Sequence, residues 1–433
     1  MKDIGVFDDI AFSREKIRWL SKEFDIIPDK YDDFKKTLYD TFASESDRLD
    51  NYFAEVDKMY VATVMNDGKV FPFLYSGLEM FYSIIFFILG ARKLIKIIKN
   101  LGDMTIREFN ERFFEKNSKL CKLLNGLMYP DMAAWMTGSV MGMSDDYWTV
   151  SKGMQSWADV LADNFKKLGG QLKLNSYVDK IITENGTAIG VSSGDVTYSA
   201  DYVISASDYK KTFLKLLDNK LLIPSEMQKK IIDAPVSEPV FTVYLGLNIP
   251  NVELKKYMKI HHVAYCDLDS DVDVHNPSDK DYFDKCSLIL YSLSMLNPSL
   301  APKGKSSLML MTMSHAGWMN NWGAGNKEKY KELKEKATKA LIKKAGQVIP
   351  NLEKYIEIQD SATPLTYERY THNSSGASSA WSWNPKKKFF PKVMSINVNT
   401  PVKNLYIGSC WANQIGGIPG ALIAAYICSK KIR

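Results

Sequence analysis

The chain has 433 residues, of which 45% are hydrophobic and 24% charged, so it is long enough for two or three domains with a large core. Its net charge of +6 is small, and it has neither a long basic stripe nor a nucleic-acid-binding motif, which argues against nucleic acid as a partner. Five scattered cysteines lack any metal-ligand or disulfide spacing, so we expect no metal and a reducing compartment. The many Tyr, Phe, Met and Trp residues suit either a lipophilic cavity or simply a large core.

The N-terminal residues are polar and show no apolar stretch of the signal-peptide kind, so we expect a cytoplasmic protein. The first fifty residues read as helical, as in Leu38 to Phe53, and resemble the interior of a domain.

An apolar stretch runs from Phe71 to Ala91 and has a single charged residue, Glu79. A basic amphipathic helix is predicted directly after it. This pattern favours a segment lying in a membrane interface, with a buried helix or lid and a true membrane span as alternatives. We therefore expect peripheral membrane association, with contacts from Phe81, Phe86, Phe87, Arg92, Lys93, Lys96 and Lys99.

The middle of the chain changes from helices to an alternation of helix and strand. Residues 104–131 read as helices, and an amphipathic helix is predicted over 156–168, ended by Gly169-Gly170. Short strands are then expected at 171–174, 178–183, 188–192, 196–199 and 202–205. A helix followed by a meander and a buried strand is an α/β unit of the kind that holds a dinucleotide.

Later segments predict an antiparallel sheet with one covered face. Its strands are expected at 240–247, 287–294 and 306–313, with a long charged helix at 327–348, and a last strand and helix at 405–407 and 420–431. The resulting division is 1–60, partial cofactor- and substrate-domain helices; 61–150, a helical substrate- or membrane-contacting region; 151–221, a cofactor-binding segment; 222–362, a substrate domain; and 363–433, a C-terminal cofactor-binding segment.

The C-terminal segment from Asn404 to Ala421 reads as a strand, a glycine-rich loop and a helix with Pro419 in its first turn. Glycines there let a backbone approach a flat or anionic ligand, and the positive end of the helix dipole favours pyrophosphate or an electron-rich ring carbonyl. A tight packing turn between strand and helix is the alternative reading of the same glycines.

Four segments in the same order resemble the phytoene desaturase, carotenoid isomerase and retinol saturase family of flavoproteins. They are Lys152–Gly170 with the strands that follow it, Asn297–Lys305, Thr363–Gly376 and the Gly408–Ala421 motif. The resemblance implies a mixed α/β (α+β) fold, an incomplete two-domain flavoprotein with a Rossmann-like FAD-binding domain and an antiparallel-sheet substrate domain. It also implies an FAD-dependent desaturase, saturase or isomerase acting on a lipophilic polyene such as a carotenoid or retinoid, with NAD(P) or a quinone as candidate electron partner.

The same resemblance implies positions for the cofactor contacts. They are Gly153, Met154, Val178, Ser205, Ala206, Gly408, Ser409, Gly416, Gly417, Ile418, Pro419, Gly420 and Ala421. Glu368 and Arg369 are candidates for the substrate side, with a surface ion pair as their alternative. Because the flavin carries the redox step, no catalytic residue is assigned.

The family normally opens with a strand and a G-x-G-x-x-G motif, and none occurs in these 433 residues. Gly323-Ala-Gly325 lacks the third glycine. Two alternatives to an active enzyme therefore stand: a non-catalytic binding protein of the same fold, and a truncated fragment without stable flavin.

Overall fold

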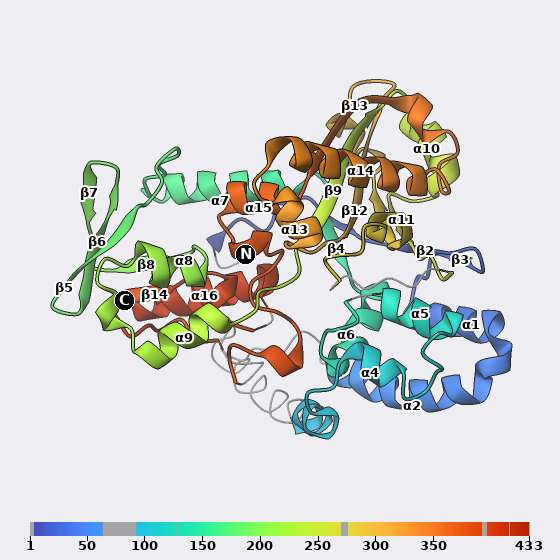
Figure 1. Ribbon diagram of the computed structural model, residues 1–433, viewed down its shortest axis with the longest axis horizontal. Helices are drawn as coiled ribbons and strands as arrows, with labels where there is room; N and C mark the ends of the chain where they lie inside the picture. The colour runs from blue at the N-terminus through green and yellow to red at the C-terminus, as the bar shows by residue number, and fades with distance from the viewer. Residues whose placement is uncertain are drawn as a thin grey trace.

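The computed structural model describes residues 4–63, 92–127, 129–269, 276–391, 396–414 and 416–432. Figure 1 shows three groups of elements: a sheet with its covering helices at the upper right, a helical group at the lower right, and a second α/β group at the left. Each has its own buried apolar cluster. The mixture of helix and sheet agrees with the predicted fold class.

A seven-stranded sheet in the order β13-β9-β12-β11-β10-β2-β3 forms the first group. Its neighbours are antiparallel except for β2 and β10, which run parallel. The expected strands at 240–247 and 306–313 are confirmed to the residue. Burial alternates from residue to residue along the second strand, as its sequence pattern predicts. The strands are β2 (Arg18–Leu20), β3 (Asp25–Ile26), β9 (Val240–Leu247), β10 (His262–Tyr265), β11 (Leu288–Tyr291), β12 (Ser306–Met313) and β13 (Ile356–Ala362).

Helix α14 (Lys327–Ala345) is the main cover of this sheet. Asn326 caps it by accepting hydrogen bonds from two amides of its first turn, and Leu333, Ala337 and Leu341 enter the core at helical spacing. Smaller helices complete the group: α10 (Asn251–Met258), α11 (Tyr282–Lys285), α12 (Leu293–Leu296), α13 (Trp318–Ala324) and α15 (Pro364–Thr371).

The start of the chain differs from the helical expectation. Residues 12–26 form three short strands, and two of them extend the seven-stranded sheet. Strand β2 pairs with the parallel strand β10, which lies more than 240 positions later in the sequence. No local sequence pattern could therefore predict β2. The first strand, β1 (Phe12–Arg14), pairs with β4 (Trp148–Val150) as a separate ribbon.

The helical group packs around Tyr52. Glycine is required at Gly138, because a Cβ there would lie 2.4 Å from the backbone of Met59, where two helices cross. Residues 92–101 are also helical, and among the described residues no helix is long and apolar enough to cross a membrane. The stretch from Phe71, with Phe81, Phe86 and Phe87, lies outside the described residues. The other helices are α1 (Tyr31–Thr41), α2 (Ser46–Thr63), α4 (Ile106–Asn110), α5 (Lys119–Gly126) and α6 (Thr137–Met141).

The third group holds the meander and a two-stranded parallel sheet. The expected helix at 156–168 and strands at 188–192, 196–199 and 202–205 are found with small shifts, whereas the strand expected at 171–174 is wrong, since those residues are exposed and unpaired. The elements are α7 (Met154–Lys167), β5 (Lys180–Glu184), β6 (Thr187–Ser193), β7 (Val196–Ser199), β8 (Val203–Ser205), α8 (Tyr209–Lys211), α9 (Ser225–Asp233), β14 (Leu405–Ile407) and α16 (Gly417–Lys431).

One part of this group is only partly covered. Helix α7 packs its apolar stripe against the small cluster around Val6, Ile10 and Val150 but buries no residue fully, and Leu168 just after its end is 77% exposed. Among the described residues, β8 pairs only with β14, and Ile204 on it is 41% exposed. A parallel sheet is normally covered on both faces, so this surface is suited to a further layer of polypeptide.

Candidate functional site

The site is built where two parallel strands end side by side. Strand β14 pairs with β8 in register, Ile407 opposite Ser205, and the amide of Gly408 donates a hydrogen bond to the Ser205 carbonyl at 2.9 Å. Gly408 must be glycine, because a Cβ would lie 2.4 Å from Ile204. In open α/β sheets, ligands bind at this carboxyl end of the strands.

From there the chain turns through a short helical turn, Cys410–Ala412, into α16. Gly416 and Gly417 have φ angles of 69° and 68°, in the left-handed region that glycine adopts readily. The amide of Gly416 donates to Asn413 Oδ1 at 2.6 Å, and that of Gly417 donates to Ser379 Oγ at 2.9 Å. Two side chains of the protein thereby cap amides at the start of this 15-residue helix.

Two buried polar atoms at this loop have no hydrogen-bond partner among the residues that the structure describes. They are Ser409 Oγ and Asn413 Nδ2, on residues that are 7% and 4% exposed. The Asn413 amide lies across the first turn of α16, where a Cβ on Gly420 would come within 2.4 Å of Nδ2. Because unpartnered buried donors are rare, this pair indicates a ligand that accepts hydrogen bonds.

An aromatic cluster fixes the segment that faces the loop. The Trp381 ring stacks on Phe389 with centroids 3.9 Å apart, and its Nε1 donates to the Trp411 carbonyl at 3.1 Å. Gln414 binds the same segment: its Oε1 accepts from the amides of Phe389 and Phe390 at 2.9 and 3.0 Å. The loop is therefore held rigidly against residues 379–390.

Of the remaining expected cofactor contacts, Ser205 adjoins this loop, because its carbonyl accepts the hydrogen bond from the Gly408 amide. Ser205 is buried, and its hydroxyl is hydrogen-bonded to the hydroxyl of Thr212 with an O–O distance of 2.7 Å. Ala206 lies just beyond the strand and is exposed. Gly153 begins α7 with a φ of 85° and lies against Leu293, and Met154 next to it is exposed. Val178 is half-buried and precedes β5 instead of lying in it.

Four expected positions lie together in the first turn of α16: Ile418 and Pro419 face outward, Gly420 is buried, and Ala421 is half-buried. Glu368 and Arg369 lie on α15. Glu368 is within 3.9 Å of Lys211 Nζ, and Arg369 lies over its neighbour Tyr370 at 5.6 Å. Adjacent helical residues face different directions, so the two do not converge on one point.

The glycines and Ser409 stay predicted cofactor contacts, whereas the sequence did not point to Asn413 and Ser379, which hold the start of α16. An asparagine three residues before a helix-opening glycine is a capping signal that could have revealed the first. Ser379 could not have been found, since it reaches the helix start from a segment 38 positions away.

Residues 95–433 match the family of flavin containing amine oxidoreductases. The chain belongs to this family. The residues present also offer a flavin two buried polar atoms that have no partner among the described residues, and of these Asn413 Nδ2 can donate to a ring carbonyl oxygen.

Three curated proteins show which members of the family are similar in sequence to this chain. The chain is 27% identical over 293 residues to a prolycopene isomerase of an Oncidium hybrid cultivar, an alignment that covers 65% of this chain and 45% of the relative. It is 24% identical over 424 residues to a 4,4'-diapophytoene desaturase of Methylomonas sp., covering 93% and 78%. It is 23% identical over 282 residues to an all-trans-retinol 13,14-reductase of Danio rerio, covering 62% and 46%. The chain thus spans about half the length of the isomerase and reductase relatives.

Solved structures agree on the fold. A redesigned putrescine oxidase superposes with a TM-score of 0.59 at 12% identity, covering 99% of this chain and 85% of the other. Cyclohexylamine oxidase from Brevibacterium oxydans gives 0.54 at 12% identity, with coverage of 100% and 85%. At such identity the likeness establishes the architecture alone.

Proposed function

We propose that this chain is the larger part of an FAD-dependent oxidoreductase that acts on a lipophilic polyene, as a desaturase, saturase or isomerase. The observation that carries the proposal is the loop from Gly408 to Gly420, where two buried polar atoms, Ser409 Oγ and Asn413 Nδ2, have no partner among the described residues. Membership of a flavin family and the names of the relatives supply the cofactor and the substrate class.

When bound, FAD supplies the transfer of hydride or electrons. The protein's part is to bind and orient it. The side-chain amide of Asn413 would donate to an acceptor on the cofactor, and Ser409 would offer its hydroxyl. Gly153, Met154, Val178, Ser205 and Ala206 stay predicted contacts on the same cofactor.

The electron partner is a further part of the proposal. NAD(P) or a quinone would complete a desaturation or a reduction, whereas an isomerisation returns its electrons to the same substrate. The reaction that the enzyme catalyses, whether desaturation, reduction or isomerisation, determines whether it needs such an electron partner.

Flavin binding tests the proposal directly. We expect the purified chain to take up added FAD, seen as a shift of the flavin absorbance bands, and we expect Asn413→Leu to weaken that binding about tenfold, since one charge-free hydrogen bond in a buried site contributes about 1–1.5 kcal/mol.

The matched control is Asn51→Leu on the exposed face of α2, which should leave FAD binding unchanged. A folded, colourless chain that gains no flavin from added FAD would refute enzyme activity for this chain alone and would favour a non-catalytic binding protein.

We also propose peripheral attachment to an anionic membrane. In the helix at 92–101 the cations Arg92, Lys93, Lys96 and Lys99 are exposed, while Ile97 packs toward the helical core. A basic face turned outward is suited to a negatively charged lipid surface.

A further inference from the structure

The segment 383–388 joins the loop from Gly408 to Gly420 to the helical group, and we call this segment the strap. Both of its ends are bound by Gln414, a residue of that loop that is 4% exposed. The side-chain amide of Gln414 donates to the Ser382 carbonyl at 2.7 Å, just before the strap. Its Oε1 accepts from the two backbone amides just after the strap at 2.9 and 3.0 Å. One buried side chain next to Asn413 therefore holds both ends of the strap.

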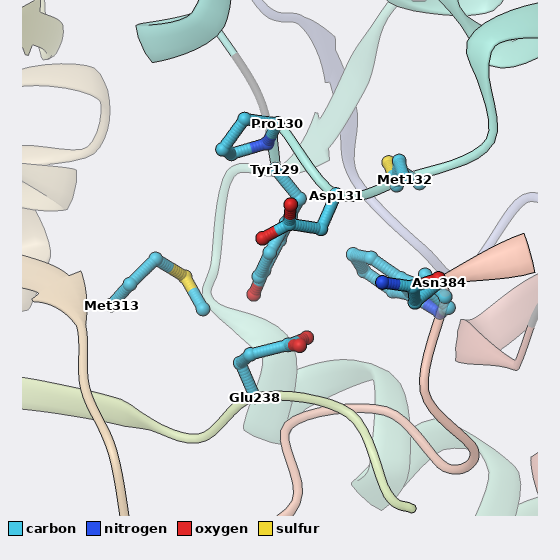
Figure 2. A pocket seen from close by; sticks show the side chains of 8 residues that line it. Tyr129, Pro130, Asp131, Met132, Glu238, Met313 and Asn384 are labelled. Atoms are coloured by element: carbon cyan, nitrogen blue, oxygen red, sulfur yellow. The ribbon is translucent and has the colours of Figure 1, made fainter. Parts of the chain in front are cut away.

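The first residues of the strap lie against the helical group. Figure 2 shows Asn384 near the segment 129–132 of that group. The ring of Trp383 meets that of Tyr129 edge to face, with centroids 4.6 Å apart. Asn384 Oδ1 also accepts from a backbone amide of the short turn 385–387 at 2.9 Å, which caps this turn. The strap is thus an ordered turn and has packed contacts on the helical side.

Two ion pairs hold the rest of the strap beside the basic helix at 92–101. Lys388 Nζ lies 2.7 Å from Asp103 Oδ1, and Asp103 follows the end of that helix by two residues. Lys386 pairs with Glu108 of α4, the next helix along the chain. Because these pairs are partly exposed, they stabilise the strap only weakly, but they fix its place next to the basic helix.

The strap extends the basic surface of the helix at 92–101. Lys386 and Lys387 are exposed, and among the described residues Lys387 has no ion pair. The same helix exposes an apolar side chain, Ile95, which is 50% exposed. Cations around an exposed apolar side chain are suited to an anionic bilayer, whose headgroups attract the charges while the acyl boundary takes up the apolar group.

We propose that the strap couples contact with an anionic membrane to the loop that we assign to the flavin. Lys386 and Lys387 contact lipid headgroups, and this contact restricts the motion of the strap. Because Gln414 holds both ends of the strap, the same contact steadies Asn413 for the cofactor. Membrane and FAD then strengthen each other's binding, since coupling between two sites is reciprocal. The inference rests on the proposed function and assigns a lipid-dependent regulation to its site.

Two measurements on the full chain test the coupling. They are the affinity for FAD, followed by flavin absorbance, and the hydrogen exchange of the amides of Phe389 and Phe390, which bond to Gln414. Each is made without vesicles, with phosphatidylcholine vesicles, and with vesicles that also contain phosphatidylglycerol. We expect the anionic vesicles to lower the Kd for FAD at least about threefold and to slow exchange at both amides, and the neutral vesicles to change neither.

Two variants locate the coupling at the two ends of this path. Lys386→Gln with Lys387→Gln keeps Lys388 and its bond to Asp103, and we expect its Kd for FAD to be the same with and without anionic vesicles. Gln414→Leu removes the bonds to both ends of the strap. We expect this variant still to float with anionic vesicles, while its affinity for FAD no longer depends on them.

The matched control is Lys336→Gln with Lys343→Gln on α14, which removes the same charge from two exposed lysines, one of them paired with Asp281 at 3.7 Å. It should keep the full effect of anionic vesicles. Circular dichroism checks that every variant is folded, and the double lysine variant, altered only at exposed side chains, decides if Gln414→Leu is not. Unchanged FAD affinity, or unchanged exchange at both amides, on anionic vesicles overturns this inference and leaves the proposed function standing. If FAD binds under none of these conditions, the proposed function fails, and this inference fails with it.

Discussion

Glu15 is a carboxylate with a side chain only 1% exposed, placed where the β1–β4 ribbon meets the seven-stranded sheet. Its Oε1 lies 2.8 Å from His261 Nε2 and 3.0 Å from His262 Nδ1, and the hydroxyl of Tyr291 donates to Oε2 at 3.2 Å. Burial alone would raise the pKa of Glu15, but the hydrogen bonds and charges of the two histidines outweigh it and lower the pKa to about 2.

A lowered pKa means that Glu15 stabilises the fold above its unfolded pKa near 4.5 and loses that contribution as the pH falls toward 2. We expect Glu15→Gln to lower the free energy of unfolding at pH 7 by about 3 kcal/mol, and the difference from the unaltered chain to shrink below pH 4.5. Urea denaturation across a pH series measures both.

Glu357→Gln serves as the control, because Glu357 pairs with Lys305 in a partly exposed bridge and should cost at most about 1 kcal/mol. A Glu15 variant with the same loss of stability at every pH would contradict the assignment of charge to this carboxylate.

The sequence predicted the glycine loop well and the buried contacts poorly, for a physical reason. Glycines and Pro419 carry their conformational demands within a few residues, so Gly408–Ala421 is readable locally. The partners of Glu15 come from β10 and β11, 247 positions away in the case of His262, and only the folded sheet brings them together. Ser379 at the start of α16 is a similar case.

At the level of elements, α13 has the longest run of left-handed backbone among the described residues. Residues 319–324 have φ angles between 46° and 96°, a left-handed turn that costs roughly 1–2 kcal/mol for each residue other than glycine. Burial of Trp318 and Trp322 offsets this cost, and the Trp322 ring stacks on Phe241 at 5.5 Å.

Ala324, with a φ of 52°, is exposed and has no such compensation. We expect Ala324→Gly to raise the free energy of unfolding by about 0.5–1 kcal/mol, because relief of the left-handed strain exceeds the entropy that glycine adds to the unfolded chain. Chemical denaturation measures the change.

The same substitution in an ordinary helix should have the opposite sign. Ala54→Gly on the exposed face of α2 is expected to lower stability by about 1 kcal/mol. Equal destabilisation of the Ala324→Gly and Ala54→Gly variants would contradict the left-handed conformation of residues 319–324.

Elements with a strong local pattern were predictable, and those held by distant partners were not. Strands β9, β12 and β14 alternate or cluster their apolar residues and were found to the residue. Strands β2 and β3 are two or three residues long and exist because β10 pairs with β2. A short strand has too few residues to show a period of two.

Across the whole molecule, the +6 net charge is partly concentrated on the outward face of the helix at 92–101. If this face attaches the protein to a membrane, the full chain should float with vesicles that contain an anionic lipid. Replacement of Arg92, Lys93, Lys96 and Lys99 by glutamine should reduce the bound fraction several-fold, since each cation near such a surface contributes about 1 kcal/mol.

Added salt should weaken this binding in the unaltered chain, because surface charges are screened within about 10 Å at 0.1 M. In the control, glutamine replaces four exposed lysines on α14, namely Lys331, Lys336, Lys339 and Lys343. The control therefore has the same net charge as the variant of the helix at 92–101. Equal flotation of the two variants and the unaltered chain would argue against the helix at 92–101 as the attachment face.

The open edge of β8 also has a consequence for the protein at high concentration. Among the described residues β8 pairs on one edge only, with β14, and its exposed Ile204 marks a template on which a strand from another molecule can pair. The chain is therefore expected to self-associate into aggregates as it is concentrated, and a charge introduced at Ile204 is expected to reduce this aggregation.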